Sequence, residues 1–192
     1  MNYRIGEVLL TEEKISRRVR EMALEIAETL QGQDLMVIGI LKGAVIFMSD
    51  LVRSVSPDVR ISMDFMAVSS YGDSTKTSGI VRIVKDLDCS VKDKNVLIVE
   101  DIVDTGLTLS YLVKLMQERE PKSVRVCALL DKEERRQVPV QVDFRGFSIP
   151  DRFVVGMGSI IPVNGGIYPQ FISWSMRTDG STISSSREAA II

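Results

Sequence analysis

Apolar residues recur along the chain in two alternating patterns, one typical of amphipathic helices and the other of buried strands. After Thr11, whose hydroxyl and two following acids suit a helix start, apolar residues repeat at helical spacing until Gly32. The apolar run at 35–40 then predicts a short buried strand, and residues 44–51 predict a second helix.

A polar segment interrupts the next pair of predicted strands. Residues 60–68 alternate apolar and polar positions, which predicts a half-buried strand with inward-facing Ile61, Met63, Phe65 and Ala67. Residues 69–79 carry two glycines and many hydroxyls and predict a mobile loop, and 80–84 predict the following strand.

The alternation of strand and helix continues further along the chain. Apolar runs at 95–99 and 124–130 predict buried strands, and residues 108–119 between them predict a helix that Pro121 closes. Strands that alternate with helices predict the α/β class, with a mostly parallel twisted sheet flanked by helices on both faces.

Composition limits the chemistry that the chain can perform. The 192 residues suit one α/β domain, and a net charge of −2 favours neither nucleic acid nor an anionic membrane as a partner. Two cysteines without a metal-binding cluster fit a cytoplasmic protein, and residues 1–10 resemble neither a signal peptide nor a membrane span. The absence of histidine excludes Ser-His-Asp and Cys-His catalysis and leaves carboxylates, lysines and backbone amides.

One segment combines acids, hydroxyls and a glycine at the end of a predicted strand. Residues 96–99 lead into Glu100 and Asp101, and a helix follows after Asp104, Thr105, Gly106, Leu107 and Thr108. Backbone N–H groups at such a helix start can bind phosphate, and paired carboxylates can hold Mg²⁺ together with substrate oxygens. The alternative is a plain strand–turn–helix with solvated acids and a threonine cap.

This contiguous run resembles the phosphoribosyl pyrophosphate signature of the type I phosphoribosyltransferases. Further motifs resemble the hypoxanthine-guanine branch of that family, in the family's order: the pyrophosphate loop at 41–43, the Ser-Tyr flap at 70–71, and the purine pocket at 129–136, 142–147 and 149–156. The resemblance spans residues 5–158.

The resemblance implies a fold and an activity. The fold is that of type I phosphoribosyltransferases, with a small hood region and a flexible loop beside the main sheet. The activity is purine salvage: with Mg²⁺, the 5-phosphoribosyl group of phosphoribosyl pyrophosphate passes to hypoxanthine or guanine, giving IMP or GMP and pyrophosphate. The resemblance also implies a homodimer or a homotetramer.

The resemblance assigns roles to the acidic turn. Residues 104–108 bind the 5′-phosphate, and Asp104 is the general base near the purine imidazole. Glu100 and Asp101 contact the ribose hydroxyls and the metal ion. A turn-forming aspartate is the alternative for Asp104.

In the purine pocket, the resemblance implies that Lys132 donates to the 6-oxo group, that Phe153 stacks on the purine, and that Val154 offers backbone groups to its edge. Taken singly, Lys132 resembles a surface lysine and Phe153 a core residue.

Two loops complete the implied site. Lys42 and Gly43 receive the pyrophosphate, and Ser70 and Tyr71 belong to the flap that closes over the substrates and excludes water.

The chain departs from the family after Gly158. The family continues with an Asp-Tyr pair that helps to bind magnesium and a basic, aromatic stretch whose arginine meets pyrophosphate, but residues 159–174 lack both. We therefore divide the chain into a phosphoribosyltransferase domain at 1–158 and an atypical, partly disordered tail at 159–192. The tail is either a frame-shifted reading of a family-like sequence or a divergent segment.

Two alternative functions follow. A regulatory protein of the same fold that binds nucleic acid is one, although a net charge of −2 and the purine-pocket motif argue against it. A catalytically impaired homologue, weakened by the altered tail, is the other.

Overall fold

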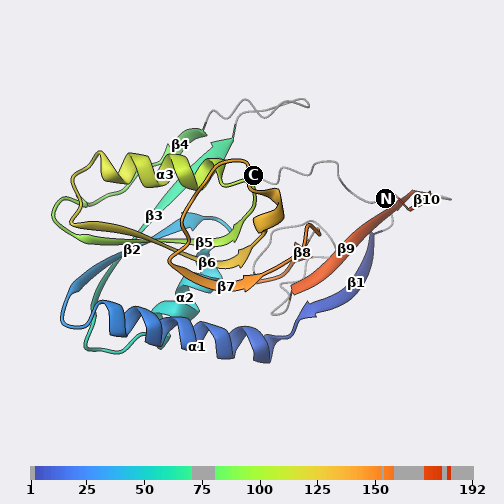
Figure 1. The fold of residues 1–192 in the computed structure, drawn as a ribbon, viewed down its shortest axis with the longest axis horizontal. Coiled ribbons are helices and arrows are strands. Elements are labelled where there is room, and N and C mark those ends of the chain that lie inside the picture. Colours follow the sequence, from blue (N-terminus) through green and yellow to red (C-terminus); the bar gives the residue numbers. More distant parts are fainter. Residues whose placement is uncertain (1–2, 71–80, 153, 158–170, 179–180, 183–192) are drawn as a thin grey trace.

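The computed structural model describes residues 3–70, 81–152, 154–157, 171–178 and 181–182 (Figure 1). Tyr71, Phe153 and most of the tail lie outside these residues, so the predictions for them stay predictions. Ser70 ends a strand, and only its backbone is described.

A six-stranded sheet forms the centre of the molecule, in the order β4-β3-β2-β5-β6-β7. Its strands, in chain order, are β2 (Asp34–Leu41), β3 (Arg60–Ser70), β4 (Val81–Lys85), β5 (Asn95–Val103), β6 (Ser123–Asp131) and β7 (Phe144–Ser148). All neighbouring strands run parallel except β4, which is antiparallel to β3. The predicted mostly parallel α/β architecture is confirmed.

Helices cover both faces of this sheet. Figure 1 shows α1 (Glu12–Thr29) and α2 (Val45–Ser54) below the sheet and α3 (Leu107–Gln117) above it. The Thr11 side chain caps α1 by accepting a hydrogen bond from the Lys14 N–H (3.4 Å), as the sequence predicted. None of the helices in the described residues is long and apolar enough to span a membrane.

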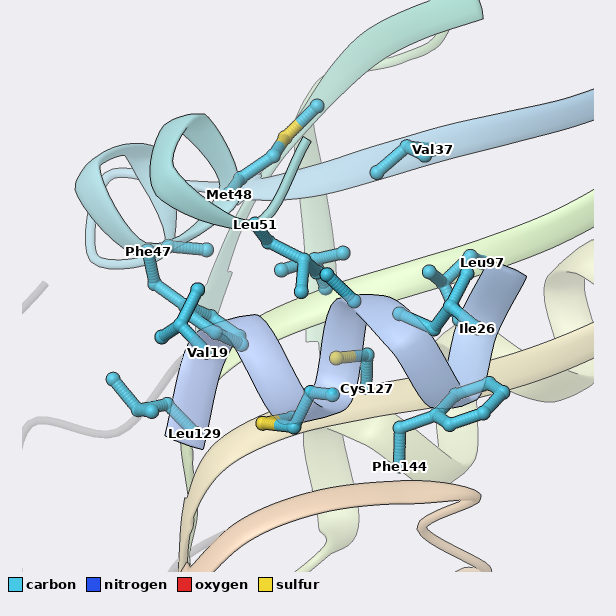
Figure 2. Close-up of a cluster of buried hydrophobic side chains, with 14 of the residues drawn as sticks. Val19, Ile26, Val37, Phe47, Met48, Leu51, Leu97, Cys127, Leu129 and Phe144 are labelled. Atoms are coloured by element: carbon cyan, nitrogen blue, oxygen red, sulfur yellow. The ribbon is translucent and has the colours of Figure 1, made fainter. Parts of the chain in front are cut away.

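The core consists of two clusters, one on each side of the sheet. On β5, Leu97 and Val99 pack towards α1 and α2, whereas Val96 and Ile98 pack towards α3. Figure 2 shows the first cluster, in which α1 and α2 lie against the strands around the fully buried Phe47. Burial on both faces explains why this strand is a continuous apolar run rather than an alternating one.

A second, smaller sheet lies beside the main one (Figure 1). Its longest strands are β1 (Tyr3–Leu10) and β9 (Phe171–Thr178), which pair antiparallel, and β9 also pairs with β8 (Val154–Val155) and β10 (Ser181–Thr182). Local patterns predict no strand at residues 3–10 or 171–178, because these strands pair with each other from opposite ends of the chain. This sheet occupies the place of the expected hood.

Met63 corrects one expectation. It was predicted to face the core, but its side chain is 59% exposed, while Phe65 on the same strand packs against the α1–α2 cluster. β4 pairs with β3 only at residues 67–70, so Met63 lies where β3 is the edge of the sheet. At this edge position neither a further strand nor a helix of the described residues covers the Met63 side chain.

Candidate active site

Three predicted motif segments meet at the edge of the main sheet that is formed by the carboxyl ends of its parallel strands. β2, β5 and β6 are parallel neighbours, so the loops that follow their carboxyl ends lie side by side. These loops begin at Lys42, Asp104 and Lys132. Ligands of open α/β sheets bind at this edge, beyond the carboxyl ends of the strands.

Gly43 brings the first loop directly against the acids of β5. A Cβ atom on Gly43 would lie 2.6 Å from the Asp101 Cγ, so any larger residue would require the carboxylate or the loop to move. The Leu41–Lys42 peptide bond just before it is cis. The predicted pyrophosphate loop and the predicted metal-binding acid are thus in contact, although they are far apart in sequence.

Burial dominates the electrostatics of Glu100 and Asp101. Desolvation, and secondly repulsion from Asp101, raises the pKa of Glu100 well above its usual range. Desolvation also raises the pKa of Asp101, although backbone N–H groups, among them that of Ile102 (2.9 Å to Oδ1), oppose the shift. The buried Glu100 Oε2 has no hydrogen-bond partner in the described residues. A cation or a donor from a ligand would satisfy this buried carboxylate oxygen.

These acids fit a magnesium ion that also binds substrate. Within the described residues, no group of three or more potential ligand side chains can hold a metal without help. Mg²⁺ commonly takes one or two protein carboxylates and fills its shell with water and phosphate oxygens. Glu100 and Asp101 match that donor set.

The turn after β5 starts α3 and exposes backbone donors. Gly106 caps α3 with a φ of 82°, a left-handed conformation that favours glycine. The Thr105 hydroxyl accepts a 3.4 Å hydrogen bond from the Leu107 N–H, while the Thr105 carbonyl accepts a 2.9 Å bond from the Gln137 N–H. The segment after β6 therefore holds the turn in place, and the first N–H groups of α3 lie where a helix can accept an anion.

A chain of charged side chains links this turn to Lys132. The Arg135 Nε lies 2.7 Å from the Asp104 Oδ1, and the Arg135 guanidinium lies 3.2 Å from the Asp151 Oδ1. The same Asp151 oxygen is 3.8 Å from the Lys132 Nζ, and Lys132 is only 7% exposed. Lys132 is therefore a buried cation at the carboxyl end of β6 and not a surface lysine.

Sequence reasoning missed part of this chain. The sequence motifs assign no role to Arg135, Arg136 or Asp151. Arg136 anchors the loop, because it pairs with the buried Asp131 and donates to the Asp104 carbonyl (3.4 Å). The position of Asp151, just before the predicted Phe153 contact, was the available signal.

Val154 lies apart from this chain of contacts. It belongs to β8, where it pairs with Ser173 of β9, and its side chain packs against the core. Its backbone therefore lies at the smaller sheet, and no described contact joins it to Lys132.

Comparison with known proteins agrees with this geometry. The model of the phosphoribosyl transferase domain family matches residues 7–159. The hypoxanthine-guanine phosphoribosyltransferase of Bacillus subtilis is 49% identical over 158 residues, which cover 82% of this chain and 87% of that protein. The enzyme of the same name from Mycobacterium avium is also 49% identical, over 80% of this chain and 78% of its own.

Solved structures show the same architecture. The crystal structure of a hypoxanthine phosphoribosyltransferase from Staphylococcus aureus superposes with a TM-score of 0.82 at 41% identity, covering 88% of this chain and 91% of that one. The chain therefore belongs to the phosphoribosyl transferase family and, within it, to the hypoxanthine-guanine phosphoribosyltransferases.

Proposed function

We propose that this chain transfers the 5-phosphoribosyl group of phosphoribosyl pyrophosphate to hypoxanthine or guanine, releasing pyrophosphate. The observation that carries the proposal is the convergence of Gly43, Asp101, the 104–108 turn and Lys132 at one edge of the sheet. This edge offers separate groups for a phosphate, a metal-bound pyrophosphate and a 6-oxopurine.

The turn at 104–108 binds the 5′-phosphate in this proposal. Donors come from the N–H groups at the start of α3 and from the Thr105 and Thr108 hydroxyls. A hydrogen bond from the Gln137 N–H to the Thr105 carbonyl holds the turn in place. Asp104 accepts the proton that the purine imidazole releases when its nitrogen attacks the anomeric carbon. Its Oδ1 is shielded from solvent and lies 2.7 Å from the Arg135 Nε, and no partner in the described residues has hydrogen-bonding geometry to it.

The acids of β5 hold the ribose and Mg²⁺. Bound Mg²⁺ supplies the positive charge that stabilises the departing pyrophosphate. Glu100 and Asp101 orient the ribose hydroxyls, and their burial disfavours two negative charges without a cation. Lys42 and the Gly43 backbone receive the pyrophosphate.

Base selection falls to Lys132. The buried ammonium donates to the 6-oxo group, whereas adenine presents an amino group there and would leave the ammonium unpaired at a cost of about 1–3 kcal/mol. Phe153 stacks on the purine, the Val154 backbone meets its edge, and Ser70 and Tyr71 close over the site.

The two free cysteines, Cys89 and Cys127, support a cytoplasmic location. We also propose that the protein forms a homodimer or a homotetramer.

The tail supports a second candidate, a catalytically impaired homologue. Residues 159–174 lack the acidic and basic residues that the family places there. Sequencing the DNA across codons 155–165 separates a frame shift from divergence: a near-identical gene that differs by one base supports the shift, and an unambiguous frame without one contradicts it.

A turnover assay tests the proposal. Purified protein with phosphoribosyl pyrophosphate and Mg²⁺ should convert hypoxanthine, guanine or both, but not adenine. Asp104→Asn should reduce turnover by at least about 100-fold, because it removes the base. Asp58→Asn is the matched control: this exposed aspartate precedes β3, at the opposite edge of the sheet.

Each other outcome points to an alternative. Substrate binding without turnover supports the impaired homologue. A salt-sensitive shift of RNA or DNA, with no purine turnover, supports the regulatory protein.

A further inference from the structure

Arg135 joins the carboxylates of the two halves of the proposed site, the phosphate turn and the purine loop. Its guanidinium contacts Asp104 of the phosphate turn and Asp151 of the purine loop, at 2.7 and 3.2 Å. It lies on the short 3₁₀ helix Glu133–Arg135, directly after Lys132. The backbone N–H of Arg135 donates to the Lys132 carbonyl (3.0 Å), and this hydrogen bond fixes the backbone from which the Arg135 side chain extends.

The charge balance of this cluster depends on both contacts of Arg135, the one to Asp104 and the one to Asp151. Asp151 has two cationic neighbours, Arg135 and Lys132, and its Oδ1 lies closer to Arg135. Burial alone would lower the pKa of Arg135, but Asp104 and Asp151 outweigh it and raise that pKa. Without the guanidinium, Asp151 would pair with Lys132 alone, and the Asp104 carboxylate would lose its ion pair with Arg135.

We infer that Arg135 is a positioning residue for the transfer reaction, and this inference rests on the proposed function. By holding Asp151, Arg135 leaves the Lys132 ammonium available to the purine 6-oxo group. By pairing with Asp104, it holds the carboxylate of the general base in the site. It thereby couples recognition of the base to its deprotonation.

Arg135 is well suited to this role because of its shape. A guanidinium carries several donors in one plane and can reach two carboxylates at once, whereas an ammonium is a point charge. Lysine at this position should therefore keep the charge but bridge poorly.

Steady-state kinetics of Arg135→Ala, Arg135→Lys and Arg135→Gln test the inference. The control is Arg53→Ala, which removes an exposed arginine of α2 that pairs with Asp50 and belongs to none of the site motifs. For Arg135→Ala, we expect kcat/KM for hypoxanthine to fall by about 10- to 100-fold, the size typical of a lost charged contact. The KM for phosphoribosyl pyrophosphate should change by less than about threefold, and Arg135→Lys should restore activity in part.

A merely structural role would give a different pattern. It would lower the melting temperature and the amount of active enzyme without separating the two KM values. The inference is overturned if Arg135→Ala, or Arg135→Gln where the alanine variant does not fold, matches Arg53→Ala in all kinetic constants. It is also overturned if both substrates lose affinity equally. A wild-type protein that neither turns over 6-oxopurines nor binds GMP would instead overturn the proposed function, and this inference with it.

Discussion

Replacing Gly43 with alanine tests the contact between the pyrophosphate loop and the metal-binding acids. The backbone of Gly43 is not left-handed, so alanine brings no conformational strain there. Its added methyl group would lie 2.6 Å from the Asp101 Cγ, much closer than carbon atoms can approach. Either the loop or the Asp101 carboxylate must therefore move.

The structure sets the size of this effect. Asp101 cannot rotate away freely, because its Oδ1 accepts a 2.9 Å hydrogen bond from the Ile102 N–H. A hydrogen bond to a charged group contributes about 1.5–3 kcal/mol, and forcing an extra methyl into a packed site costs about 1–3 kcal/mol. If this cost falls on the bound state, kcat/KM for phosphoribosyl pyrophosphate should drop by about 10- to 100-fold.

The assay measures initial rates at varied phosphoribosyl pyrophosphate and saturating hypoxanthine, with Mg²⁺. Gly32→Ala is the matched control, because Gly32 has a φ of 70° but nothing within 4 Å of an added Cβ. That variant should lose about 1–2 kcal/mol of stability and keep its kcat/KM. Equal kcat/KM values for the two variants would refute the predicted contact.

Three further predictions concern charge, selectivity and packing. Glu100→Gln should stabilise the ligand-free protein above pH 4.5, as measured by urea titration. Because the pKa of Glu100 is raised on folding, the folded protein keeps this proton to a higher pH than the unfolded chain does. Wild-type stability therefore falls as the pH rises past 4.5, and the substitution should bring no gain below that pH. A gain that persists at pH 3.5 would contradict this cause. Lys132→Met should raise the KM for hypoxanthine by about 10- to 100-fold while the KM for phosphoribosyl pyrophosphate stays within about threefold, and equal changes in both would refute its assignment to the base. Phe47→Ala should lower the free energy of unfolding by about 3–5 kcal/mol and the half-exposed Ile46→Ala by less than about 1 kcal/mol, so similar losses would argue against the packing in Figure 2.

Local patterns were enough to predict the central α/β unit. The apolar run of β5, the acids at its end and the glycine before α3 are contiguous, so their order alone indicates strand, turn and helix. Parallel neighbours bring such loops to a common edge, and the location of the site follows from the topology.

Long-range contacts could not be predicted in this way. Nothing in the spacing of Gly43 and Asp101 shows that one fits against the other, because the pairing of β2 with β5 decides it. Arg135 has the composition of any surface arginine, and only the fold places it between two carboxylates. The strand β1 was missed for the same reason, since it depends on β9 from the far end of the chain.

A crystal structure with bound GMP would show where the sugar phosphate lies. We predict the 5′-phosphate within hydrogen-bonding distance of the N–H groups of residues 104–108, with the guanine 6-oxo group facing the Lys132 ammonium. A phosphate bound elsewhere, with that turn making no contact to the nucleotide, would contradict this prediction.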